Sequence, residues 1–344
     1  MGLSTVLLAQ VADATFSIVA YDEETQELGV AVQSRAFSVG AGVPWAEAGV
    51  GAIATQATTN ESFGPRGLAL LRAGYAAPEV LQMLLHTDSR PENRQVGIVD
   101  ARGGAVAHTG NACSAWAGDT TAVGLSVQGN ILAGPEVLTS MLRAFTQTPG
   151  ELSERLLAAL HAAQAAGGDR RGQQSAALLV VRPSAAYPEY RWRYVDLRVE
   201  DHPTPIDELG RIFRIHQASD LLRAHLRYAA HYDSLGQEEA ARRERRRIGE
   251  TLRSTLARDH VEASTLNALA WFCATSDIYL EESLEAAERA VGLEPENSGI
   301  LDTLAEVLFR LGRTEDALRT IDRAIALDPD DAYLQQQRAR FEAR

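Results

Sequence analysis

The sequence predicts an α+β domain built on stacked antiparallel sheets, followed by an all-helical domain. In the first part of the chain, strand-like runs are followed by helices, then by strands, helices and strands again. This order is not the βαβ alternation of a parallel sheet, and it favours antiparallel sheets with paired helices packed outside them. Several strands are apolar almost throughout, as expected for two sheets stacked between helical layers. In the last third of the chain, amphipathic helical runs recur at a constant spacing.

The first strands are expected between residues 15 and 57, and two helices follow them. The strand-like runs are TFSIVAY, ELGVAVQSR and GVGAIATQA, with turn residues between them. GPRGLALLRAG and APEVLQMLLHTD then carry helical patterns. These runs form the first block of the α+β domain.

A second block repeats the same order. RQVGIVDA, GAVAHTG and TAVGLSVQGN are strand-like, and two helices follow in PEVLTSMLRAF and ELSERLLAALHAA. In the first of these helices, Val137, Met141 and Phe145 are spaced i, i+4, i+8, which places them on one face. SAALLVVRP and WRYVDLRVED return to strand character, and PIDELGRIFRIH begins the helical remainder of the chain.

The last third of the chain contains two copies of a helical-pair pattern. The copies begin at Leu266 and Leu301, and Pro295 and Pro329 close them at an offset of 34 residues. The first copy has one extra residue in its inter-helix turn. Small residues would let the helices approach closely, and these are Ala286, Ala290, Ala305, Ala317 and Ala324. The period resembles the tetratricopeptide repeat, which implies a protein or peptide partner, and the preceding helical run is expected to supply a degenerate third pair.

Composition and charge exclude several classes of function. A formal net charge of −13 disfavours binding to the phosphate backbone of a nucleic acid. The chain contains no lysine, which excludes a phosphate-loop lysine, a Schiff-base lysine and a Ser–Lys pair. The two cysteines and eight histidines form neither a disulfide framework nor a metal-binding pattern. We therefore expect no metal and no other cofactor.

The first fourteen residues leave the location of the protein open. LSTVLLAQV is a short apolar run, and ADA is the kind of site that export peptidases read, but no basic residue precedes the run. Residues 1–14 are therefore expected to be a pro-segment or a truncated signal peptide. The cysteine usage favours a cytoplasmic location, and export to the periplasm is the alternative. No apolar run reaches the roughly 20 residues of a membrane-spanning helix, so no membrane partner is expected.

Thr15 is the candidate for nucleophilic chemistry. A threonine hydroxyl is a poor nucleophile unless a base lies beside it. If Thr15 were the first residue, its own α-amine, with a pKa of about 7.7–8.0, would supply that base. This chemistry requires that every residue before Thr15 be removed. The alternative is that Thr15 is an ordinary strand-forming residue.

The segment TFSIVAYDEETQELGVAVQSR resembles the opening of the N-terminal-nucleophile (Ntn) hydrolases. More narrowly, the segment from Thr15 to about Leu209, 195 of the 344 residues, resembles the "domain of unknown function 1028" family of that superfamily. The resemblance is carried by TFSIVAYD, GVAVQSRAFSVGAGVP, GVGAIATQATTN, HTGNACSAWAG, VQGNILAG, AGGDRRGQQSAALLV and LRVEDHPTPIDEL. It implies a four-layer αββα sandwich and an N-terminal threonine that cleaves a C–N bond. Members of the family commonly begin Met-Thr-Phe, whereas fourteen residues precede Thr15 here.

The other candidate site residues stand near strand ends. The side-chain amide of Asn130, or the backbone N–H groups around Gly129, would stabilise a tetrahedral oxyanion. The alternative is that both residues serve only the turn after their strand. Asp169 would orient the Thr15 ammonium or bind substrate, or would only shape a glycine-rich turn. Arg35 would bind a substrate carboxylate, or would lie on the surface without a ligand. Further candidates for substrate binding are Gln56, Asn60, Gln174 and Ser175.

These observations predict four segments and one function. The segments are the extension 1–14, an Ntn-like domain over 15–209, a helical connector over 210–258 and repeats over 259–344. The predicted function is hydrolysis of a small amide or peptide-like substrate without a cofactor. The repeats would recruit a protein or peptide, or would join copies of the chain into a homo-oligomer. The alternative is a catalytically inactive Ntn-fold scaffold that acts through its repeats.

Overall fold

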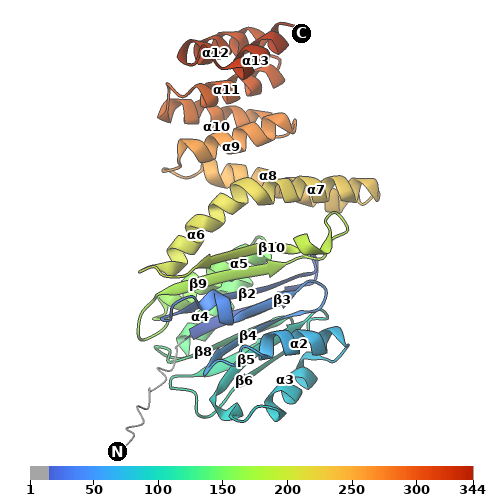
Figure 1. Ribbon diagram of the computed structural model, residues 1–344, viewed down its shortest axis with the longest axis vertical. Helices are drawn as coiled ribbons and strands as arrows, with labels where there is room; N and C mark the ends of the chain where they lie inside the picture. The colour runs from blue at the N-terminus through green and yellow to red at the C-terminus, as the bar shows by residue number, and fades with distance from the viewer. Residues whose placement is uncertain (1–14, 344) are drawn as a thin grey trace, which may run out of the picture. The chain divides into compact units, whose positions relative to one another are not determined.

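The computed structural model describes residues 15–343. The predicted N-terminal extension, residues 1–14, lies outside the described residues, as does residue 344. The chain divides into two compact units between Phe213 and Arg214. The first is a mixed α/β domain with two sheets, and the described elements of the second are all helices (Figure 1). The predicted α+β domain followed by an all-helical domain is confirmed at this level.

The larger sheet of the first unit has six antiparallel strands. Its order is β10-β9-β2-β1-β8-β7, so β1 lies inside the sheet between β2 and β8. Thr15 of β1 is paired with Ser34 of β2 on one side and with Asn130 of β8 on the other. The strands are β1 (Thr15–Asp22), β2 (Glu27–Ser34), β7 (Gly118–Ala122), β8 (Leu125–Asn130), β9 (Ser175–Val181) and β10 (Arg193–Val199).

The smaller sheet has four antiparallel strands in the order β3-β4-β5-β6. Its strands are β3 (Pro44–Glu47), β4 (Gly51–Ala57), β5 (Arg94–Asp100) and β6 (Ala105–Thr109). One face of this sheet packs on the six-stranded sheet. Val19, Val30 and Val32 of the larger sheet share a buried apolar cluster with Ala54 and Val99 of the smaller one. Because successive side chains of a strand point to opposite faces, every second residue of β1 and β2 enters this inter-sheet layer.

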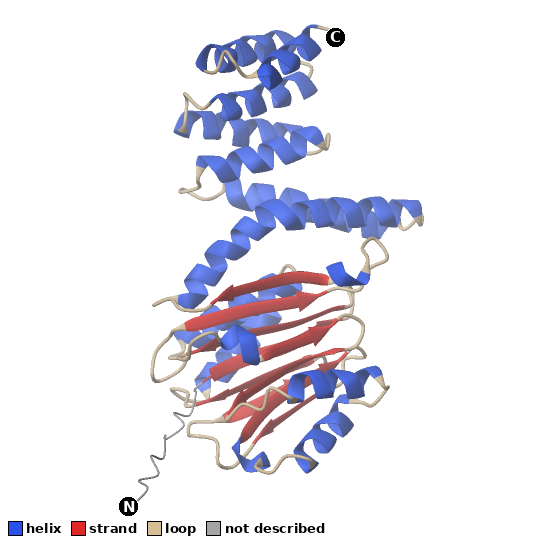
Figure 2. Ribbon diagram, viewed as in Figure 1, coloured by secondary structure: helices blue, strands red, loops and turns tan. Residues whose placement is uncertain are grey.

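Helices cover the outer faces of both sheets (Figure 2). Helices α2 (Phe63–Arg72) and α3 (Ala77–His86) pack on the four-stranded sheet, where Ile53 and Ile98 are buried against Leu84. Helices α4 (Glu136–Gln147) and α5 (Leu152–Ala165) pack on the six-stranded sheet. The remaining short elements of this unit are α1 (Val39–Gly42), η1 (Pro91–Asn93) and η2 (Glu189–Arg191).

The helical region starts with α6, and its later helices form the two predicted pairs. In the second unit, Asn297 accepts backbone hydrogen bonds at the start of α11, and Asp331 does so at the start of α13. The five alanines predicted to allow close helix packing are all fully buried. The helices are α6 (Pro205–His216), the π-helix η3 (Gln217–Leu221), α7 (Leu222–Ser234), α8 (Glu238–Leu256), α9 (Ala263–Thr275), α10 (Leu280–Leu293), α11 (Ser298–Arg310), α12 (Thr314–Leu327) and α13 (Ala332–Glu342). None of the described helices combines the length and apolar character that a membrane crossing requires.

A glycine in β5 makes room for polar side chains between the sheets. A Cβ added at Gly97 would lie 2.7 Å from Ser126 Oγ and in closer contact still with the Gln128 amide. Ser126 and Gln128 both belong to β8 and are fully buried. The inter-sheet layer is therefore apolar along most of its length and polar where β8 approaches β5.

We expect Gly97→Ala to lower the free energy of unfolding of the first unit by about 1–3 kcal/mol, because the added methyl group overpacks this polar layer. Thermal or urea unfolding of the full chain measures the change. Gly292→Ala is a control with the opposite expected effect, because a Cβ at Gly292 meets nothing within 4 Å. This substitution should stabilise α10 by about 0.5–1 kcal/mol, since alanine favours a helix more than glycine does. An unchanged unfolding midpoint for Gly97→Ala would contradict the described packing.

A second prediction concerns Asp302 of α11, which is 5% exposed and whose Oδ1 has no hydrogen-bond partner among the described residues. Burial and the nearby Glu306 carboxylate raise the pKa of Asp302 to about 6. A raised carboxyl pKa means that stability falls as pH rises from about 4 to 6. Asp302→Asn should therefore stabilise the helical unit by about 3 kcal/mol at pH 7.5 and have little effect at pH 4. An equal effect at both pH values would refute the assignment.

Candidate functional site

Thr15 lies at the beginning of an interior strand, among buried polar groups. Its side chain donates from Oγ1 to Ser34 Oγ at 3.1 Å, and its carbonyl oxygen accepts from Gln56 Nε2 at 3.3 Å. Asn130 is its register partner on the other side. Thr15 is 2% exposed, and Asn130 and Gln56 are buried as well. Three sequence-predicted residues from three separate strands therefore meet at this end of the two sheets.

Gln95 joins these residues into one network, although it was not among the candidates from the sequence. Its Oε1 accepts from Gln56 Nε2 and from Asn130 Nδ2, both at 2.9 Å. Its Nε2 lies 2.8 Å from Gly129 O and 2.9 Å from Thr109 Oγ1, and donates to both. Gln95 is fully buried at the start of β5. The orientation of the Asn130 amide is fixed by this side chain of the opposite sheet.

Further polar contacts continue the network between the sheets. Ser17 Oγ donates to Gln56 Oε1 and accepts from Gln128 Nε2, each at 2.6 Å. Ser126 Oγ in turn donates to Gln128 Oε1 at 2.6 Å. Satisfied buried amides of this kind hold one geometry, because any rotation would leave a buried donor or acceptor without a partner.

Asp169 ties together the chain segments on either side of Thr15. Its backbone forms a β-bridge with Leu132, just beyond β8. Its Oδ2 accepts from the backbone N–H of Arg35, just beyond β2, at 3.0 Å. The Arg171 side chain donates to both carboxylate oxygens, at 3.3 and 3.0 Å. The described contacts of the Asp169 carboxylate are thus with Arg35 and Arg171, and its predicted role toward the Thr15 ammonium stays a prediction.

Arg35 and Gln174 lie together at the same end of the sheet. Arg35 Nη1 donates to Gln174 Oε1 at 2.7 Å, and Gln174 Nε2 donates to Asp201 Oδ1 at 3.1 Å. The backbone N–H of Gln174 also donates to Ser34 O at 3.0 Å. The Arg35 side chain is exposed, so its guanidinium is held at the surface by a neutral amide, between the end of β2 and the start of β9.

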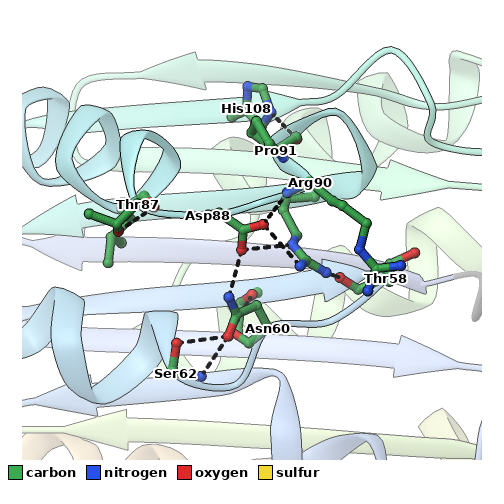
Figure 3. A network of polar contacts seen from close by, with 11 residues as sticks. Thr58, Asn60, Ser62, Thr87, Asp88, Arg90, Pro91 and His108 are labelled. Atoms are coloured by element: carbon green, nitrogen blue, oxygen red, sulfur yellow. Dashed lines mark hydrogen bonds and ion pairs between the residues drawn. The ribbon is translucent and has the colours of Figure 1, made fainter.

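The two other predicted substrate-binding residues make internal contacts. Ser175 is fully buried, and its hydroxyl donates to Ala36 O at 2.6 Å and accepts from the Val39 N–H at 3.0 Å. Asn60 belongs to a separate cluster, in which its Nδ2 donates to Asp88 Oδ2 at 2.6 Å (Figure 3). Ser175 thus holds the segment after β2, and Asn60 holds the segment before β5. The substrate-binding roles of these two residues stay predictions.

The cluster around Asp88 connects the start of β5 with the segment that follows β4. Asp88 accepts two hydrogen bonds from Arg94, from Nε and Nη2, both at 3.0 Å, and both side chains are almost fully buried. Arg94 also donates to Thr58 O (Figure 3). Burial alone would raise the pKa of Asp88, but hydrogen bonds from Arg94, the Arg90 backbone and Asn60 lower it to about 2. This ion pair holds Arg94 one residue before Gln95.

Cys113 is a further candidate nucleophile in this region, and its environment is unfavourable for a thiolate. The thiol donates to Arg94 O at 3.4 Å, and burial raises the pKa of Cys113. A raised thiol pKa lowers the fraction of the reactive thiolate at neutral pH. Within residues 15–343, no group of three His, Cys, Asp or Glu side chains is arranged to hold a metal ion.

Comparison with known proteins shows which family the domain that contains this site belongs to. Residues 15–209 match the model of a family of unknown function, DUF1028. The chain belongs to the DUF1028 family. A DUF1028 protein from Silicibacter pomeroyi, known from its crystal structure, is 32% identical, with a TM-score of 0.54; the match covers 59% of this chain and 89% of that one. Residues 280–341 match a tetratricopeptide repeat model, and no curated protein matches the chain.

The Asp88–Arg94 pair generates a prediction about stability and pH. A lowered carboxylate pKa adds stability above about pH 4, and that stability is lost as pH falls toward 2. We expect the loss to be about 2 kcal/mol for this DUF1028 domain. In Asp88→Asn the loss between pH 4 and 2 should shrink by that amount, as measured by urea unfolding. Glu189→Gln, which removes an exposed carboxylate, should keep the wild-type slope, and a parallel slope for Asp88→Asn would contradict the assignment.

Proposed function

We propose that the DUF1028 domain is an Ntn-type amidohydrolase with a four-layer αββα sandwich and Thr15 as its nucleophile. The proposal rests on one observation above all. Thr15 is the first residue of an interior strand. The residues paired with it on the two neighbouring strands, Ser34 and Asn130, both have polar side chains, and Ser34 accepts a hydrogen bond from the Thr15 hydroxyl. The packing of helices on the outer faces of two stacked sheets supports the fold assignment.

The reaction would proceed through an acyl-enzyme. Thr15 Oγ attacks the amide carbonyl carbon, and its proton passes through the Thr15 α-amine to the leaving nitrogen as the C–N bond breaks. Water then hydrolyses the resulting ester, which restores the Thr15 hydroxyl and releases the acid. No cofactor takes part in these steps.

Asn130 would stabilise the tetrahedral oxyanion. One N–H of its amide donates to Gln95, and an amide nitrogen carries a second N–H that can donate to substrate. Because Gln95 holds the amide in place before substrate arrives, the donor requires no reorganisation during the reaction. Gln56 would hold the Thr15 carbonyl, and Asp169 would hold the segments on either side of Thr15.

The proposed base exists only if the Ala14–Thr15 bond is cut. Cleavage would convert the amide nitrogen of Thr15 into an α-amine with a pKa of about 7.7–8.0, close to neutral pH. Residues 1–14 would then act as a pro-segment or as part of a signal peptide. The tetratricopeptide repeats would bind a protein or peptide, or would join copies of the chain into a homo-oligomer.

The second candidate is an inactive Ntn-fold scaffold that acts through its repeats. The observation that favours it is the burial of Thr15, which is 2% exposed. If the residues before Thr15 were retained in the mature protein, the hydroxyl would lack both a base and access to substrate.

Intact-mass measurement on protein from its native host, together with labelling by an acylating probe, tests the proposal. We expect a species that begins at Thr15 and one acylated residue per chain. Thr15→Ala should lose labelling while its unfolding midpoint stays close to that of the wild type, and Thr15→Ser, which keeps a hydroxyl, should retain labelling in part. A labelled preparation that still contains residues 1–14, or undiminished labelling of Thr15→Ala, would sink the mechanism.

A further inference from the structure

Two arginines lie on opposite sides of Thr15 and have neutral partners. Arg35 directly follows Ser34, the β2 partner of Thr15, and its Nη1 donates to the side-chain amide oxygen Oε1 of Gln174 at 2.7 Å. The backbone N–H of Arg170 donates to Ile131 O at 3.1 Å, directly after Asn130, the β8 partner of Thr15. The Arg170 side chain donates from Nη2 to the backbone oxygen of Ala115 at 2.7 Å.

Other arginines of this region are paired with carboxylates. Arg171 binds Asp169, and Arg94 binds Asp88, so their positive charges are compensated inside the protein. Over residues 15–343, neither Arg35 nor Arg170 forms an ion pair, and both side chains are exposed. Each guanidinium is held in place by one carbonyl oxygen, which leaves further N–H donors of its fork unused.

The charge of the whole protein makes this arrangement informative. A net charge of −13 repels small anions in general. Two guanidinium groups without a carboxylate partner, on residues that follow or contact the strand ends paired with Thr15, make the local field more favourable for an anion. The planar fork of arginine matches the two oxygens of a carboxylate, which gives directional as well as electrostatic recognition.

We propose that the ligand of this site is a dicarboxylate whose two carboxylates bind Arg35 and Arg170 on either side of Thr15. This inference rests on the proposed function for its catalytic meaning, since it makes the substrate an amide with a carboxylate on each side of the scissile C–N bond. The binding itself depends only on the two arginines. It does not require a free Thr15 amine, because both guanidinium groups are exposed in the chain as it stands.

Isothermal titration calorimetry of the full chain tests the proposal with linear dicarboxylates from malonate to pimelate. At least one should bind more tightly than butyrate and than its own diamide, and its affinity should fall as salt rises. Arg35→Gln and Arg170→Gln should each weaken it about tenfold, which corresponds to one charge-assisted hydrogen-bonded contact. The matched control is Arg66→Gln, because Arg66 is also exposed and held by one neutral oxygen, Thr87 Oγ1 at 2.7 Å.

The outcomes separate this inference from the proposed function. Dicarboxylate binding that is weakened in both arginine variants, in a chain that no acylating probe labels, supports the site and rejects the hydrolase. Labelling at Thr15 without preference for dicarboxylates supports the hydrolase and overturns the site. Binding that is equal for butyrate, or that Arg66→Gln weakens as much as Arg35→Gln does, also overturns it.

Discussion

The side-chain amide of Gln95 is the contact on which the geometry around Thr15 depends. It reaches from the four-stranded sheet to the six-stranded sheet and binds the side chains of Gln56 and Asn130 together with the backbone of Gly129. A fully buried amide with this many partners has one acceptable orientation. Since its partners sit beside Thr15, the relative position of the two sheets and the position of the candidate nucleophile are set by the same group.

The two ends of the inter-sheet layer serve different purposes. Toward Val19, Val30 and Val99 the layer is apolar, and burial of these side chains contributes hydrophobic stabilisation. Toward Thr15 it contains serine, glutamine and asparagine side chains, which contribute less hydrophobic stabilisation but fix the directions of donors and acceptors. The Asp88–Arg94 ion pair fixes the first residue of β5, and Gln95 follows directly, so this polar end of the layer is held by polar contacts rather than by apolar packing.

Strand periodicity and turn residues predicted the α+β domain and the helical repeats. They also placed Thr15, Gln56 and Asn130 at strand ends, and the structure brings these three residues together. Gln95 was missed because RQVGIVDA has the pattern of an ordinary strand, and pairing between sheets leaves no local mark in a sequence. The sequence did contain one indication of this role: Gln95 lies two positions before Gly97, so both residues are on the same face of the strand. Asn60 stands four residues after Gln56, but Ala57 adopts a left-handed backbone conformation (φ 68°), and Asn60 instead contacts Asp88.

The interior position of β1 has a consequence for how this family can vary. The register of β1 is set by hydrogen bonds to β2 on one side and to β8 on the other, from Thr15 onward. A substitution that shifts the register of either neighbouring strand would therefore displace Thr15, so the ends of β2 and β8 constrain the position of the first residue of β1.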